Sequence, residues 1–288
     1  MNYFLNIAIV ISIILILSAS LNLIMGYGGM FHMGHGAFYA IGAYTGALIF
    51  TRLGLPFLLE MLIAGIVAGA FGLIIGFPSI RLKGDYLSFI SYGFAVVIYT
   101  IVLNWVSVTK GPVGISGVMR PTIFGINFSS MPAYLVLCLV ICAICYFAIK
   151  RITDSSYGKS IEAFREDEIA AYSCGRNVAS LRVQIFCVGA FFAGIAGDLY
   201  VHYMTIADPT GFTTNASFIL VSMVIIGGMG SLLGAATGAV LVVLVPQLLI
   251  LLGLPGFYSD QIQNIIYSLI LIIIVIRRPQ GIFGKLKI

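Results

Sequence analysis

The sequence predicts an all-α, polytopic integral membrane protein. Of its 288 residues, 60% are hydrophobic and only 9% are charged, whereas a soluble domain carries roughly 25% charged residues. The first charged residue is Arg52, and no charge lies between Asp208 and Asp260. A spanning helix needs about 20 apolar residues, so each of these two stretches is long enough for two segments. Runs of this length favour helices over barrel strands.

The apolar runs divide the chain into nine expected segments. Two of them, beginning near Gly28 and Gly227, are rich in glycine and could be broken or re-entrant helices, so we expect about eight or nine transmembrane or re-entrant helices. No basic residue precedes the first run, which we interpret as a retained span and not a cleaved signal peptide. We expect one transmembrane domain over residues 1–288. The segments are 3–25, 32–51, 57–77, 86–108, 131–149, 181–206, 213–228, 231–252 and 260–276.

The basic residues indicate the orientation. Residues 79–84, 150–182 and 277–288 together hold 12 of the 15 lysines and arginines. Cytoplasmic connections carry such an excess, so we place these three segments and the C-terminus in the cytoplasm and the loop 109–130 outside. This bias explains the net charge of +5, and no nucleic-acid partner is needed to account for it.

The connection 150–182 is the longest polar stretch. Asp154-Ser155-Ser156 can begin a short helix that runs through Phe164. The acids Glu166-Asp167-Glu168 can begin a second helix, where the helix dipole favours them, and Gly175 can end it in the left-handed conformation. The two helix starts favour a rigid docking element within the transmembrane domain. The alternative is a solvated connection between two spans.

One motif in this connection resembles a phosphate-binding loop. Residues 153–160 read TDSSYGKS, but the motif requires glycine where Thr153 stands and a buried strand before it. We therefore expect no nucleotide binding by this chain.

A weak internal repeat relates two glycine segments. Gly28-Gly29-Met30 and Gly227-Gly228-Met229 are each followed by further glycines. Duplicated halves with interrupted helices are common in transporters, but small residues also serve simply to pack helices closely, and both interpretations stay open. The candidates for the translocation pathway or for helix breaks are Gly28, Gly29, Gly34, His35, Gly36, Asp198, Gly227, Gly228 and Gly230.

Few side chains in the predicted spans could carry chemistry. His32 and His35 could share a metal, but the only other histidine, His202, is distant in the sequence, and we expect no metal or other cofactor. Asp198 is a costly carboxylate within an apolar span and hence a functional candidate. It could instead pair with a neighbouring helix or lie near the external interface.

Several motifs along nearly the whole chain resemble those of one known family. In order they are GYGG at 26–29, GHGAF at 34–38, GAY at 42–44, RLKGDYL at 81–87, the run from Asp154 to Ala171, GGMGS at 227–231 and RPQGIFG at 278–284. In this set the sequence resembles the second, M-type permease subunit of the bacterial high-affinity branched-chain amino-acid ABC importers.

The resemblance implies an ABC importer permease fold in the bacterial inner membrane and a non-catalytic role in transport. It implies a second homologous permease, two separate ATP-binding subunits that drive transport, and a soluble substrate-binding protein. The substrates would be leucine, isoleucine and valine. A urea or amide importer shares this architecture, and a membrane-embedded enzyme built on His32, His35 and Asp198, or a channel, is a further alternative.

The resemblance also assigns the connection 150–182 to coupling with the ATPase. Its Ala170, Ala171 and Gly175 are similar to the family's Ala-Ala-x-x-x-Gly signature, while Ile169 stands where related importers often have glutamate. The residues expected to couple are Glu162, Ala163, Arg165, Glu166, Asp167, Glu168, Ala170, Ala171 and Gly175.

Overall fold

The computed structural model describes residues 2–82, 84–123 and 125–251, together with 265–266, 268–269, 272–273, 276–277 and 280–284. The long helices are α1 (Asn2–Asn22), which continues as a π-helical turn (Leu23–Tyr27), α2 (His35–Leu53), α3 (Phe57–Ser79), α4 (Asp85–Asn104), α6 (Met131–Asp154), α9 (Val178–Met204), α10 (Thr214–Gly227) and α11 (Leu232–Leu251). The short ones are α5 (Val106–Thr109), α7 (Ser156–Glu166) and α8 (Glu168–Ser173), with 3-10 turns at Gly111–Val113 and Pro209–Phe212.

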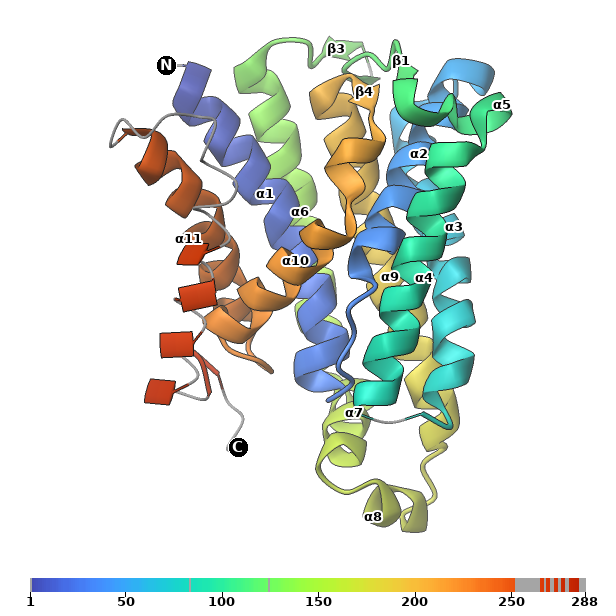
Figure 1. Cartoon of the computed structure of the whole chain (residues 1–288), viewed down its shortest axis with the longest axis vertical. Coiled ribbons are helices and arrows are strands. Elements are labelled where there is room, and N and C mark those ends of the chain that lie inside the picture. The colour runs from blue at the N-terminus through green and yellow to red at the C-terminus, as the bar shows by residue number, and fades with distance from the viewer. Residues whose placement is uncertain are drawn as a thin grey trace.

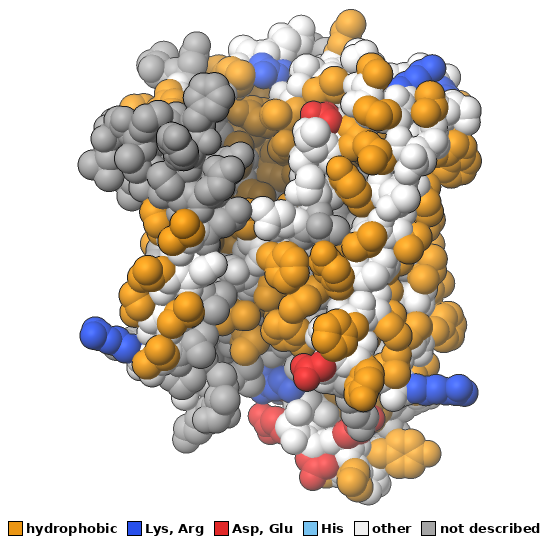
Figure 2. All heavy atoms as spheres, in the orientation of Figure 1, with side chains coloured by type: hydrophobic (Ala, Val, Ile, Leu, Met, Phe, Trp, Pro, Cys, Tyr) orange, Lys and Arg blue, Asp and Glu red, His pale blue; other side chains and the backbone are white. Residues whose placement is uncertain are grey.

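The helices form a bundle in which α9 packs most extensively against α3 and α2 (Figure 1). Helix α2 is central, because 13 of its 19 residues are buried on all sides of the helix. Helices α3, α4 and α6 instead expose large apolar side chains, among them Ile66, Phe89 and Phe147. Hydrophobic side chains cover the flank of the molecule that Figure 2 shows, as expected of a surface that faces lipid.

The predicted segments up to residue 251 correspond to observed helices. Among the described residues, five helices are long and apolar enough to cross a membrane, and two shorter apolar helices follow at Asn215–Gly227 and Leu232–Val245. The segment predicted from residue 32 begins as a helix only at His35, because residues 28–34 are not helical. Most of the ninth predicted segment, 260–276, lies outside the described residues.

Both glycine-rich segments interrupt helices. The first break separates the π-helical turn from α2, and the second separates α10 from α11 at residues 228–231. Helix α10 has 14 residues, or about 21 Å of rise, which is shorter than a hydrocarbon core of about 30 Å. It lies obliquely across the bundle (Figure 1).

The two ends of the bundle differ. One end carries α7 and α8, and the other carries short strands (Figure 1). There β1 (Ile115–Ser116) pairs antiparallel with β4 (Ile206–Ala207), and β2 (Thr122–Ile123) pairs with β3 (Ile126–Asn127). The first pair ties the loop after α4 to the chain that follows α9.

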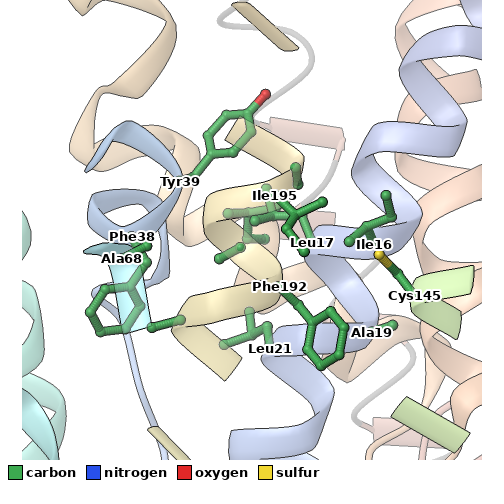
Figure 3. Packing of buried hydrophobic residues seen from close by; sticks show 14 of the residues in the cluster. Ile16, Leu17, Ala19, Leu21, Phe38, Tyr39, Ala68, Cys145, Phe192 and Ile195 are labelled. Carbon is green, nitrogen blue, oxygen red and sulfur yellow. The ribbon is translucent and has the colours of Figure 1, made fainter. Parts of the chain in front are cut away.

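Small residues bring the central helices into close contact. A Cβ atom at Gly42 on α2 would overlap the backbone of Gly194 on α9, so α2 and α9 cross with their backbones touching. Around this crossing, branched and aromatic side chains of α1, α2 and α9 interlock, including Leu17 and Phe192 (Figure 3). Cys145 of α6 is buried in the same packing, as expected of a small apolar residue.

Candidate functional site

Helices α7 and α8 form a hairpin whose two helix starts are capped by side chains. The Ser155 hydroxyl accepts a hydrogen bond from Gly158 N at 3.3 Å. Asp167 Oδ1 accepts from Ile169 N at 2.9 Å and Ala170 N at 3.0 Å, which satisfies backbone donors that the first turn leaves free. Gly175 follows α8 with φ of +76°. The two capped helices that the sequence predicts are therefore present.

Arg165 fastens the hairpin to the first helix break. Its Nη1 donates to the Gly26 carbonyl at 2.9 Å, so it satisfies a backbone acceptor that the interrupted helix leaves open. Its aliphatic stem lies on Gly29, where an added Cβ would be 2.5 Å from Arg165 Cγ. Gly29 also has φ of +63°, a conformation that glycine adopts without strain. The hairpin and the break therefore form one contact.

Arg182 provides a second attachment that the sequence analysis missed. At the start of α9 it is buried, its Nη1 donates to the Ser79 carbonyl at 2.6 Å, and its Nη2 pairs with Glu168 Oε2 at 3.2 Å. The guanidinium also lies 5.8 Å from the centre of the Phe164 ring. Arg182 thus joins α3, α7, α8 and α9. Its position at the entrance of an apolar span, where a charge needs a partner, was the available signal.

The exposed surface of α8 differs from the predicted pair of alanines. Ala170 is exposed, but Ala171 is buried, since successive helical residues point about 100° apart. The large exposed apolar side chains are Ile169 and Tyr172, which are 80% and 74% exposed. Of the two alanines expected to dock, Ala170 is therefore exposed together with Ile169 and Tyr172, and Ala171 is not exposed.

A groove of about 450 Å³ separates α7 from α8. Its lining includes five of the residues expected to couple, namely Ala163, Glu166, Asp167, Ala170 and Ala171, along with the basic residues Lys159 and Arg176. Glu162 lies on α7 and is partly exposed.

The two helix breaks lie against each other. The Asn22 side chain bridges them: its Nδ2 donates to the Ser231 carbonyl at 2.7 Å, and its Oδ1 accepts from Gly230 N at 3.0 Å. A Cβ at Gly26 would overlap Gly230 N. The sequence analysis did not select Asn22, although a carboxamide in an apolar run was a signal, because a buried amide must find partners.

The other glycines selected from the sequence also lie at close approaches. An added Cβ would overlap the Ser91 carbonyl at Gly34 and the Gly234 backbone at Gly227. At Gly36 it would lie 2.6 Å from Ser217 Oγ, and at Gly28 it would lie 2.7 Å from the Ile24 carbonyl. Gly228 has φ of +116°. The chain therefore uses these glycines where backbones meet or turn.

The polar residues expected within the spans form two separate groups. His35 Nε2 lies 2.8 Å from Ser20 Oγ, and the His32 ring packs edge-on to it at 5.8 Å between centres. Asp198 instead packs on Gly46 of α2. Gly46 lies eleven residues after His35, which is about 16 Å along the helix. The enzyme hypothesis built on His32, His35 and Asp198 is therefore wrong, because these side chains do not converge.

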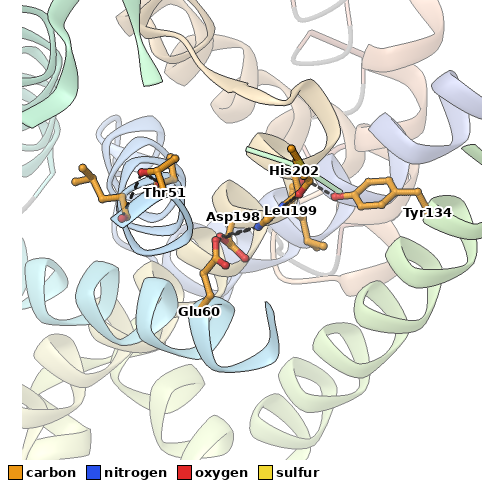
Figure 4. Close-up of polar contacts among 9 residues, drawn as sticks. Thr51, Glu60, Tyr134, Asp198, Leu199 and His202 are labelled. Carbon is orange, nitrogen blue, oxygen red and sulfur yellow. Dashed lines mark hydrogen bonds and ion pairs between the residues drawn. The ribbon is translucent and has the colours of Figure 1, made fainter. Parts of the chain in front are cut away.

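Asp198 belongs to a cluster with Glu60 of α3 and His202 of α9 (Figure 4). His202 Nε2 lies 2.9 Å from Glu60 Oε1 and 3.9 Å from Asp198 Oδ1, and all three side chains are fully buried. Glu60 was not selected from the sequence. The spacing of Asp198 and His202, four residues apart on one helix face, and the acid in the first turn of a neighbouring span were the available signals.

Comparison with known proteins gives a consistent result. The family model described as branched-chain amino acid transport system / permease component matches residues 3–275. The chain is similar to the high-affinity branched-chain amino acid transport system permease protein LivM of Escherichia coli (strain K12), with 34% identity over 96% of this chain and 69% of that protein. A probable LivM of Methanocaldococcus jannaschii is 27% identical, over 94% of this chain and 80% of that protein.

More distant similarity extends to a second type of permease. The LivH permease protein of Salmonella typhimurium is 25% identical, over 91% of this chain and 88% of that protein. No solved structure gives a significant match. The family model covers nearly the whole chain, and the helices of this chain form a multi-pass bundle. The chain therefore belongs to the family of branched-chain amino acid transport system permease components.

Proposed function

We propose that the chain is the permease subunit of an ABC importer for branched-chain amino acids, with the α7–α8 hairpin as its coupling element. The observation that carries the coupling role is the rigid attachment of an exposed apolar surface. Ile169, Ala170 and Tyr172 project from a hairpin whose Arg165 and Arg182 bond to the helix break and to the end of α3. A movement imposed on this surface reaches the membrane helices through these contacts.

The partners follow from the family. The chain pairs with a second homologous permease, as the existence of both LivM and LivH relatives supports. Two ATP-binding subunits dock on the hairpins, and a soluble binding protein delivers the substrate. Hydrophobic side chains project beside acidic ones at the end of the molecule that carries α8 (Figure 2), a surface suited to a groove with a basic rim.

The absence of nucleotide binding by this chain has structural support. Thr153 lies within α6, and Lys159 lies within α7. A phosphate-binding loop requires a glycine-rich turn whose backbone donors converge on the phosphate, and the sequence around Thr153 is helical instead. ATP hydrolysis therefore takes place on the partner subunits.

The coupling proposal is tested with Ala170→Arg and Tyr172→Ala. Burying a new charge, or removing an apolar anchor, at an interface costs more than 1.4 kcal/mol and therefore lowers ATPase association at least about tenfold. The measurements are pull-down of the ATPase and uptake of labelled leucine, with the membrane level of the permease as reference.

The matched control is Val113→Arg, at a site that is 77% exposed in the loop before β1. This variant retains association and uptake. Unchanged association and uptake in both hairpin variants, at normal expression, would exclude the hairpin as the coupling element.

The proposed orientation places α8 and the C-terminus in the cytoplasm. The native Cys174 is exposed beside α8, whereas Cys138, Cys142 and Cys145 are buried. An impermeant thiol reagent applied to intact cells leaves Cys174 unlabelled until the membrane is permeabilised, while a cysteine introduced at Val113 is labelled at once. Immediate labelling of Cys174 would reverse the topology.

A further inference from the structure

The cluster of Glu60, Asp198 and His202 lies between α3 and α9, toward the end of the bundle that carries the strands (Figure 4). Its three side chains have no exposed surface. Gly46 of α2 faces the cluster, and a Cβ there would overlap Asp198 Oδ1 and lie 3.4 Å from Glu60 Oε1. The absence of a side chain at Gly46 therefore provides the space that the Asp198 carboxylate occupies.

The hydrogen bonds around His202 fix which of its nitrogen atoms faces the acids. Its Nδ1 lies 2.6 Å from the Met119 carbonyl oxygen, which can only accept, so Nδ1 carries a proton and donates. Nε2 then faces Glu60 Oε1 at 2.9 Å, so a proton lies between these two atoms when no metal is bound. Bonding the outer nitrogen of a histidine to a backbone carbonyl is the usual way to orient a metal ligand.

The cluster holds two acids and, among the described residues, no lysine or arginine. Both oxygens of Asp198 and Oε2 of Glu60 are buried without a hydrogen-bond partner among the described residues. Within the same part of the chain, no lysine or arginine pairs with either acid, and His202 is flanked by the apolar rings of Phe50 and Phe57. Two carboxylates can be buried together only if protons or a metal ion neutralise their charge.

We propose that Glu60, Asp198 and His202 bind a divalent transition-metal ion of the zinc class. One imidazole and two carboxylates form a donor set that zinc accepts, and bond lengths of about 2.0–2.1 Å place tetrahedral ligand atoms about 3.3 Å apart. The observed separations from His202 Nε2, 2.9 Å to Glu60 and 3.9 Å to Asp198, lie on either side of that spacing. All three ligand atoms lie within 4.8 Å of one another.

The metal balances the charge of the two carboxylates and replaces the proton that the 2.9 Å contact between Nε2 and Oε1 requires in the metal-free site. Because Glu60 is on α3 and the other two ligands are on α9, the ion ties these helices together. This site is distinct from the coupling hairpin and does not depend on the proposed function. It replaces the expectation, drawn from His32 and His35, that the chain holds no metal.

The experiment measures zinc in the purified full-length chain. The protein is stripped with a chelator, equilibrated with zinc, freed of unbound metal and analysed by elemental mass spectrometry. The wild type retains about one zinc ion per chain, and its melting temperature rises on zinc addition. Asp198→Asn and His202→Gln lose both effects, and Gly46→Ala, which fills the space beside the ligands, weakens them.

The matched control is Asp208→Asn, which removes an acid from the same end of the bundle but outside the cluster and keeps an oxygen that can cap Thr210. It retains zinc like the wild type. Asp198→Asn is nearly isosteric, so it decides the question if His202→Gln does not fold. The proposal is overturned if the wild type retains no zinc, or if the wild type and Asp198→Asn retain equal amounts. The site would then hold a proton only.

Discussion

Helix α9 meets α3 at two polar networks, one near each end, and the two are built in opposite ways. Near its start, the buried Arg182 is surrounded by acceptors, the Ser79 carbonyl and the carboxylate of Glu168. Near its end, Asp198 and His202 face another acid, Glu60, and no lysine or arginine among the described residues. The first network contains its own counter-charge, whereas the second has an excess of acid that a proton or a metal ion must neutralise.

This difference shows how burial decides what a charge does. In a medium of low dielectric constant, a paired charge holds its neighbours in place, while an excess of one sign must be neutralised by a proton or a metal. The network at Arg182 therefore suits a mechanical joint below the coupling hairpin. The network at Asp198 suits a binding site.

The largest loss of stability is expected at the Arg182 network, in which the charges are balanced. Arg182→Ala removes the ion pair with Glu168 and the hydrogen bond to the Ser79 carbonyl, so we expect the free energy of unfolding in mixed micelles to fall by about 3 kcal/mol. ATPase association falls with it, because α8 loses its link to α9. Arg176→Ala, at an exposed site on the same connection, changes the free energy of unfolding by no more than about 0.5 kcal/mol. If Arg182→Ala lowers the free energy of unfolding no more than Arg176→Ala does, the contacts of Arg182 are unimportant.

At the Asp198 network, in which the charges are unbalanced, a substitution is expected to stabilise the metal-free protein. In metal-free protein, Asp198→Asn removes one of two buried acids and supplies an amide donor for Glu60, so the free energy of unfolding rises by about 1 kcal/mol. The same unfolding measurement in the presence of a chelator tests this sign. Destabilisation comparable to that of Arg182→Ala would mean that the two networks are balanced alike.

The smallest effect is expected at an exposed pair on the hairpin. Glu166 lies 3.4 Å from Arg165, but its side chain is 74% exposed, and solvent screens such pairs. Glu166→Gln therefore changes the free energy of unfolding by less than about 0.5 kcal/mol. A larger loss in Glu166→Gln than in Arg182→Ala would contradict the view that burial sets the size of these effects.

The fold was largely predictable because each helix depends on a local property. Charge-free stretches locate the helices up to residue 251, and the caps at Ser155 and Asp167 follow from residue type and spacing. Glycine pairs indicate both helix breaks. These signals act within a few residues, so they can be recognised in a single sequence.

The contacts that build the sites were less predictable, because they join residues far apart in the chain. Asn22 meets Gly230, Arg165 meets Gly26, and His202 meets Glu60. Each residue stands out as a polar group in or beside an apolar run, but the sequence does not give its partner. The exposure of the two alanines on α8 could not be predicted for a different reason: a pair of adjacent alanines does not indicate which of them points outward.

The bridge at Asn22 has a consequence for how the protein is made. Asn22 and Gly230 are 208 residues apart, so at about 5–20 residues per second the ribosome needs about 10–40 s to supply the partner of that amide. During this interval the first helix break lacks the backbone groups that complete it. The arrangement around Asn22 is therefore completed only after α10 has been made, and a chain truncated before residue 230 leaves this buried amide without Gly230 and Ser231.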